Sequence, residues 1–238
     1  MTDSPQSAAL VWTKQRRVPS RRAPSVERIV RTAVEIADAE GLDAVSMRRV
    51  ATALGSGTAS LYRYVACRDD LLDLMIDAVH GAAPPPELTG DWRADLRAVA
   101  EHTRATLIRH PWLGAELTGR PALGANSLRL HDIALTAAGA FTRDIDLAAA
   151  VVDTVQAYVF GAVAHQLAEE RARRRTGRTE AEWRQSVAPY LRSVLDSGAY
   201  PEFGRRVREA GDPDPAQRFA FGLECVLDGI ATRSRNQL

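Results

Sequence analysis

The stretch SMRRVATALGSGTASLYRYVACRDDLL, Ser46–Leu72, decides the fold of this chain. It holds two short helical patterns, residues 46–54 and 58–65, joined by a glycine-serine-glycine turn, and four arginines precede its first acid. Helices this short are marginal alone, because nucleation is costly below about 12 residues. The two patterns therefore need packing partners elsewhere in the chain.

The sequence on either side provides these partners. Ser25 can cap a preceding helix that Gly41 ends as a left-handed C-cap. Its apolar face consists of Val26, Ile29, Val30, Ala33, Ile36 and Ala37. A following helix starts at Asp69 and Asp70, whose carboxylates favour the positive end of the helix dipole, and runs to His80. We expect these two helices to cover the short pair.

One face of residues 58–65 stays uncovered, with hydroxyl side chains and Arg63, while Leu61 and Val65 are expected in the core. This is the pattern of a helix-turn-helix, in which one helix crosses the phosphate backbone and the second places side chains in the major groove. Thr58 is the expected cap of the second helix. The pattern predicts binding to double-stranded DNA.

Positive charge is concentrated in two segments, although the 238-residue chain has a formal net charge of only +1. Residues 1–24 contain one lysine and four arginines against a single acid, with three prolines, which predicts a flexible basic arm. Residues 44–68 contain four arginines and no acid. Local charge of this kind favours contact with phosphate. A solvated surface without a partner stays the alternative for each segment alone.

The rest of the chain also has the period of helices, with no sustained alternation typical of strands, so the expected fold class is all-α. Asp91 caps a long helix that runs to about His110, and Thr179 with Glu182 forms a capping box. Further helices are expected at residues 112–117, 125–142, 147–173, 179–197, 202–210 and 215–233.

Glycine and proline at residues 81–86 mark a boundary. We therefore expect a basic arm at 1–24, a three-helix helix-turn-helix domain at 25–80 and a larger helical domain at 87–235.

Residues 25–80 resemble the TetR family of bacterial repressors. The resemblance rests on EIADAEGLDAVSMRRVATALG, on SLYRYV and on the basic residue that opens RDDLL. The C-terminal part is similar to the tetracycline-repressor branch in DWRADLRAVA, HPWLG, YVFGAVAHQLAEE and FAFGLECVLDGI. The resemblance implies a homodimer whose N-terminal domains bind a palindromic operator and whose C-terminal domain binds an effector and mediates dimerisation.

The resemblance also implies two kinds of DNA contact. The base-reading positions fall on Arg48, Thr58, Ala59, Ser60 and Arg63. The phosphate-positioning roles fall on Ser46, Tyr62, Tyr64 and Arg68. Arg48 is the leading base reader, because a guanidinium can bond to both O6 and N7 of guanine. For any one of these residues, contact with the DNA backbone alone, or no contact with DNA, stays the alternative.

The helices at 147–168 and 215–233 carry small residues beside large apolar ones, which allows close helix approach. In the family these elements form a four-helix bundle between two protomers. The dimer contacts that this implies are Val152, Val155, Val159, Phe219, Gly222, Leu223, Val226 and Ile230. An ordinary intramolecular core is the alternative interpretation.

The candidate effector-binding residues are His102, Thr103, Trp112, His131, Tyr158 and His165. The tetracycline repressor holds its drug through magnesium on a histidine in the segment equivalent to residues 112–119. The sequence here is WLGAELTG and has no histidine. We therefore expect no metal and no cofactor, and an apolar or aromatic effector.

The remaining features restrict the class of protein. Cys67 and Cys225 match no metal or redox spacing, which favours a reducing compartment. No leader and no uninterrupted apolar run of roughly 18 residues is evident, so we expect a cytoplasmic protein without a membrane partner. No HExxH, GxSxG, Walker or dinucleotide motif points to an enzyme. We expect a transcriptional repressor that an effector releases from DNA; a ligand-independent dimeric DNA-binding protein is the alternative.

Overall fold

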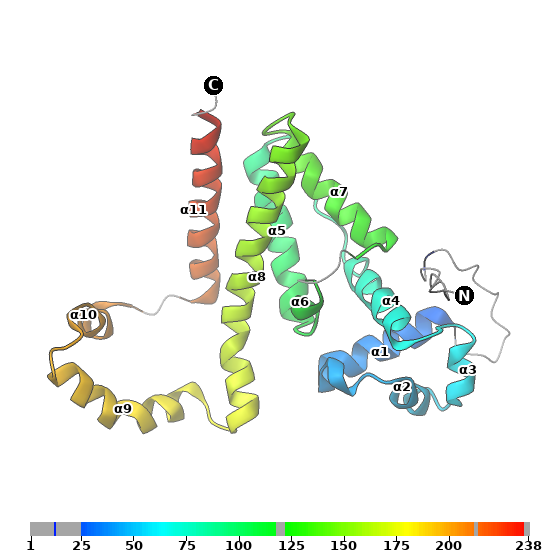
Figure 1. The fold of residues 1–238 in the computed structure, drawn as a ribbon, viewed down its shortest axis with the longest axis horizontal. Helices are drawn as coiled ribbons and strands as arrows, with labels where there is room; N and C mark the ends of the chain where they lie inside the picture. The colour runs from blue at the N-terminus through cyan, green and yellow to red at the C-terminus, as the bar shows by residue number, and fades with distance from the viewer. Residues whose placement is uncertain (1–11, 13–24, 118–121, 212–213, 236–238) are drawn as a thin grey trace, which may run out of the picture. The chain divides into compact units, whose positions relative to one another are not determined.

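A computed structural model describes residues 12, 25–117, 122–211 and 214–235 of the chain (Figure 1). These residues form eleven α-helices and one 3-10 turn, and no strand occurs among them, which confirms the all-α prediction. The chain divides into two compact units, Met1–Asp153 and Thr154–Leu238. The basic arm predicted at 1–24 lies outside the described residues, apart from Trp12.

The first unit begins with the four predicted N-terminal helices. They are α1 (Val26–Glu40), α2 (Met47–Ala53), α3 (Thr58–Tyr62) and α4 (Arg68–His80), and a 3-10 turn, η2 (Leu42–Ala44), lies between α1 and α2. Ser25 accepts from the Arg28 N–H and Ser46 from the Arg49 N–H, so both hydroxyls cap their helices. Gly41 ends α1 at a φ of 89°, where a side chain would be strained.

Two boundaries near the recognition helix differ from the prediction. The N-cap of α3 is Gly57, and Thr58 is already helical, so Thr58 is not the cap. The helix ends at Tyr62 because its last turn tightens into a 3-10 bond from the Tyr64 N–H to the Leu61 carbonyl (2.9 Å). Leu61 and Val65 are both fully buried, as predicted.

The first unit continues through α5 (Trp92–Arg109), α6 (Leu113–Glu116), α7 (Ala125–Gly139) and the first turns of α8 (Ile145–Thr176). Asp91 caps α5, as predicted, because its carboxylate accepts from the Arg93 and Ala94 N–H groups. Within this unit α1 packs on α2 and α4, and α7 packs on both α4 and α5. The core of the N-terminal helices is thus continuous with the helices that follow.

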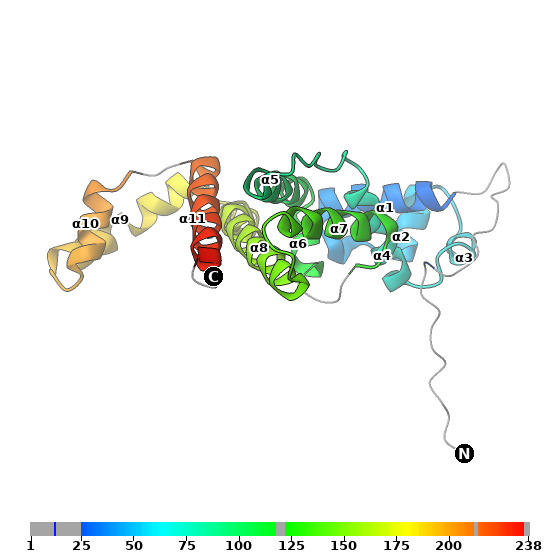
Figure 2. The same ribbon diagram turned by 90° about the horizontal axis from the view of Figure 1, so that it is seen from above.

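The second unit comprises the rest of α8, α9 (Glu180–Asp196), α10 (Pro201–Glu209) and α11 (Pro215–Arg235). The capping box of Thr179 and Glu182 is present at the start of α9. In both views α11 lies beside α8 (Figures 1 and 2). The Tyr158 hydroxyl donates to the Phe219 carbonyl at 2.7 Å, and the two rings are 5.5 Å apart.

Helix α8 has an unusual balance of composition and burial. Residues Ile145–Ala168 are long and apolar enough to cross a membrane, with a mean hydropathy of 1.6, but polar residues such as Asp153 and His165 interrupt them. Only 33% of the apolar window is buried within the chain. Its valines at 151, 152, 155, 159 and 163 are buried, and its exposed positions include the small residues Ala157, Gly161, Ala164 and Ala168.

Candidate nucleic-acid interface and ligand region

The four arginines of residues 44–68 have different surroundings. Arg49 forms an ion pair with Glu40 of α1. The Arg68 guanidinium donates to the carbonyl oxygens of Val45 and Leu42, each at 3.2 Å. Arg49 thus links α2 to α1, and Arg68 links the start of α4 to η2 and to the residue that follows η2.

The two remaining arginines of this segment, Arg48 on α2 and Arg63 directly after α3, are exposed. Both guanidinium groups are therefore accessible to a duplex. The phosphate contact predicted for Arg68 stays a prediction, with two of its donor groups already bonded to backbone carbonyls.

The other predicted DNA contacts lie on the same two packed helices and the turn that follows them. Ala59 is exposed, Tyr62 is 51% exposed, and Thr58, Ser60 and Tyr64 are half-buried. Ser46 is exposed and already serves as the cap of α2. The helix-turn-helix thus presents a short surface of hydroxyls with Arg48 and Arg63 exposed beside them, and the individual contacts stay predictions.

A polar cluster that the sequence did not reveal joins α4 to α7. Asp77 near the end of α4 caps α7, since its Oδ1 accepts from the Asn126 N–H (2.8 Å) and the Ser127 N–H (3.0 Å). Asn126 Nδ2 donates to the carboxylate and to the carbonyl of Asp77, both at 3.1 Å. His80 Nδ1 lies 2.8 Å from Ser127 Oγ. We call Asp77, His80, Asn126 and Ser127 the α4–α7 clamp.

A second polar cluster joins α1 to the start of α6. His110 Nδ1 lies 2.8 Å from Asp38 Oδ1, and Trp112 Nε1–H donates to the same oxygen at 2.8 Å. His110 and Trp112 are both buried. Through these two clusters, α1 and α4 form hydrogen bonds to residues of the helices that follow residues 81–86 within the same unit.

The six predicted effector residues do not share one environment. In the first unit, His102 is half-buried, Thr103 donates to the Val99 carbonyl of its own helix, and His131 is exposed. The Trp112 indole N–H donates to the Asp38 carboxylate. In the second unit, Tyr158 bonds to the Phe219 carbonyl and His165 is exposed. Their contact with an effector stays a prediction.

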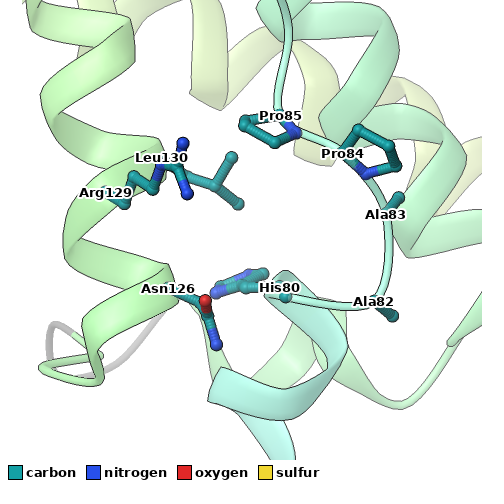
Figure 3. A pocket seen from close by; sticks show the side chains of 9 residues that line it. His80, Ala82, Ala83, Pro84, Pro85, Asn126, Arg129 and Leu130 are labelled. Atoms are coloured by element: carbon teal, nitrogen blue, oxygen red, sulfur yellow. The ribbon is translucent and has the colours of Figure 1, made fainter.

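A cavity of about 330 Å³ lies in the first unit, and none of those six residues lines it (Figure 3). Its walls come from the end of α4, the segment after it and the first turns of α7. The lining residues are His80, Gly81, Ala82, Ala83, Pro84, Pro85, Asn126, Arg129 and Leu130. We call this space the junction cavity. Within the described ranges, no three His, Cys, Asp or Glu side chains gather in a way that could hold a metal ion.

Most of the predicted dimer contacts are covered by their own chain. Six of the eight are buried in the single chain: Val152, Val155, Val159, Phe219, Leu223 and Ile230. Gly222 and Val226 are half-buried, and a Cβ at Gly222 would overlap the Tyr158 ring. These side chains have little area left for a second copy. Their contact with a partner stays a prediction, and their burial fits the intramolecular alternative.

The fold and this surface define a helix-turn-helix DNA-binding protein with a larger helical regulatory domain. Residues 29–75 match the family described as "Bacterial regulatory proteins, tetR family", and residues 84–234 match "Tetracyclin repressor-like, C-terminal domain". The chain belongs to the TetR family of bacterial transcriptional regulators.

Individual relatives agree with this assignment along most of the chain. The "HTH-type transcriptional repressor DrrR1" of Streptomyces coeruleorubidus is 42% identical over 234 residues, covering 96% of this chain and 86% of the relative. Apo ActR from Streptomyces coelicolor has a TM-score of 0.74 and 28% identity, covering 93% of this chain and all of ActR. ActR in complex with actinorhodin has a TM-score of 0.70 and 32% identity, covering 87% and 95% of the two chains.

Proposed function

We propose that this protein is a cytoplasmic transcriptional repressor that binds a palindromic operator as a homodimer and leaves it when a small molecule binds. The helix-turn-helix at residues 46–72, with Arg48 and Arg63 exposed, carries the DNA-binding part of the proposal. The relative DrrR1 is named a repressor, and the structural neighbour ActR has been solved with actinorhodin, which supports ligand response. A ligand-independent dimeric DNA-binding protein is the alternative.

The homodimer is supported by surfaces that a single chain leaves uncovered. On α8 the exposed residues Thr154, Ala157, Gly161, Ala164 and Ala168 recur every three or four positions, which places them on one face. On α11 the exposed residues Phe221, Cys225, Gly229 and Thr232 do the same, and Phe221 is 75% exposed. Small side chains let helices approach closely, and apolar surface of this kind marks association.

The predicted buried contacts on these helices then form the core behind the interface, and the exposed faces meet the partner. This moves the proposed contact surface to the opposite side of each helix. The proposal keeps α8 and α11 as the dimer helices.

The proposed function is tested by selecting bound sites from random duplex DNA. We expect a palindrome whose two half-sites are centred about one helical turn, or a multiple of it, apart, because a two-fold dimer presents two recognition helices. Recovery of no common sequence would overturn the proposed repressor. A single unpaired half-site would overturn the dimer. The selected operator is used in the tests below.

A further inference from the structure

The junction cavity has polar walls whose hydrogen-bonding capacity can be assigned. Ser127 Oγ donates to Asp77 Oδ1 at 3.4 Å, so its hydroxyl proton is used and its lone pairs face His80 Nδ1. We therefore assign the Nδ1–H tautomer to His80, which leaves Nε2 as an acceptor. Burial lowers the pKa of His80, so the ring is neutral at pH 7.

Asn126 contributes a second acceptor. Both hydrogens of its Nδ2 are used, one on the Asp77 carboxylate and one on the Asp77 carbonyl. The amide oxygen is thus the group left for a ligand. In Figure 3 this oxygen lies on the side of His80, and the amide nitrogen points away from the cavity.

The remaining walls are cationic and apolar. Arg129, one helical turn after Asn126, is exposed and carries the positive charge of the lining. Leu130 and Pro85 are half-buried, and with Pro84 they provide flat or branched apolar surface (Figure 3). The cavity volume of about 330 Å³ suits a small ligand of one or two rings.

We propose that the junction cavity is the effector site and that it takes a hydroxylated aromatic acid. The hydroxyl donates to His80 Nε2 or Asn126 Oδ1, the acid group accepts from the Arg129 guanidinium, and the rings lie against Leu130 and the two prolines. This inference rests on the proposed function, because it names the ligand class of the repressor and the place where it binds.

The position of the cavity explains how such a ligand would act on DNA binding. His80 and Asn126 belong both to its lining and to the α4–α7 clamp. A ligand can shift an equilibrium only if it contacts two states differently. A molecule bonded to the end of α4 and the start of α7 favours one arrangement of these helices, and α4 belongs to the helix-turn-helix domain.

The probe is 6-hydroxy-2-naphthoate, titrated into the full-length protein by calorimetry and by NMR. Its methyl ether, 6-methoxy-2-naphthoate, keeps the rings and the acid but cannot donate. We expect the phenol to bind at least tenfold more tightly than the ether, and about 5–150-fold more weakly when the protein is saturated with the selected operator. Equal affinity for phenol and ether, no binding of the phenol at millimolar concentration, or indifference to the operator would each overturn the proposal.

Two variants locate the site. Arg129→Ala removes the cation, and Leu130→Trp fills the cavity; both are expected to lower phenol affinity at least tenfold while binding the operator normally. Arg143→Ala, which removes an exposed arginine beyond the end of α7, is the matched control and should bind the phenol as the natural protein does. Unchanged phenol affinity in both cavity variants would place the ligand elsewhere. If the natural protein without ligand failed to bind the operator, that result would instead count against the proposed function.

Discussion

Arg48 and Arg49 are neighbours in sequence, and both are exposed on α2. Arg49 forms an ion pair with Glu40 of α1, so its guanidinium is directed toward that helix. We expect Arg48→Ala to weaken binding of the selected operator by about 1–3 kcal/mol and to relax preference at one base position, because a bidentate contact with guanine discriminates by that amount. Fluorescence anisotropy with operators altered at single positions measures both effects.

Arg49→Ala is the matched control, since it removes the same charge from the same helix. Its ion pair lies on the surface and contributes about 0–1 kcal/mol to folding. Base preference should then be unchanged in this variant. An Arg48→Ala protein with natural affinity and natural preference would show that Arg48 reads no base.

His80 gives the protein a stability that depends on pH. Burial lowers its pKa and nearby His102 lowers it further, while the charge of Asp77 opposes both. Burial also lowers the pKa of His102. The unfolded histidines, with pKa values of about 6.5, then bind more protons than the folded ones as pH falls below that value. Stability is complete above pH 6.5 and declines as pH drops through the lowered pKa values.

We therefore expect the free energy of unfolding, measured in urea, to fall between pH 7.5 and pH 5.5. Each histidine can contribute a slope of at most about 1.4 kcal/mol per pH unit, since one proton is involved. His80→Gln should flatten this dependence, with His131→Gln, at an exposed position, as the comparison. An unchanged slope in His80→Gln would assign the pH dependence to other groups.

At the scale of the element, the start of α7 depends on a side chain from another helix. Its N-cap residue, Gly124, has no side chain to offer, and Asp77 of α4 caps the helix instead. A Cβ at Gly124 would overlap the Asp77 carboxylate. We expect Gly124→Ala to lower the free energy of unfolding by about 1–3 kcal/mol, the usual cost of overpacking.

Gly139, at the other end of α7, has nothing near the position of a Cβ. Gly139→Ala should be neutral or should stabilise by up to about 1 kcal/mol, because alanine favours the helix. The two variants are compared by urea unfolding at one pH. Equal stabilities would show that the Asp77 cap does not hold α7 in place.

These same elements show what the sequence could predict. Caps such as Ser25, Ser46 and Asp91 lie within three residues of the N–H groups they bond, so a local pattern is enough to find them. Asp77 and Asn126 are 49 residues apart, and Asp38 and Trp112 are 74 apart. No local sequence pattern marks such pairs. The motif HPWLG indicated the family resemblance, but it did not indicate that the Trp112 indole N–H donates to Asp38 of α1.

The predicted dimer contacts illustrate a related limit. Periodicity shows that α8 is apolar on more than one face, and both Val155 and Ala157 suit an interface between helices. Which face is covered by the same chain depends on α11, since the contact partners Tyr158 and Phe219 are 61 residues apart. Tyr158 determines which face of α8 is buried, because its ring lies against Gly222 and its hydroxyl donates to the Phe219 carbonyl of α11.

At the scale of the whole molecule, the arrangement of α8 and α11 determines which substitution tests the dimer. Gly222→Arg would collide with Tyr158 inside one chain, so it would report on folding. Gly161 is exposed on the small-residue face of α8, with nothing near the position of a Cβ. Gly161→Arg should therefore leave the single chain folded, and its long charged side chain would stand where the partner's helix approaches.

We expect Gly161→Arg to sediment as a monomer with a normal helical circular dichroism spectrum. An unpaired charge buried between protomers costs several kcal/mol, which is enough to separate a dimer at micromolar concentration. Operator affinity should fall with it, because one recognition helix makes only half of the contacts. Gly139→Arg, with equal space but on α7, should remain dimeric. If Gly161→Arg also remains dimeric, the exposed face of α8 is not the interface, and the apolar surface of that helix has another partner.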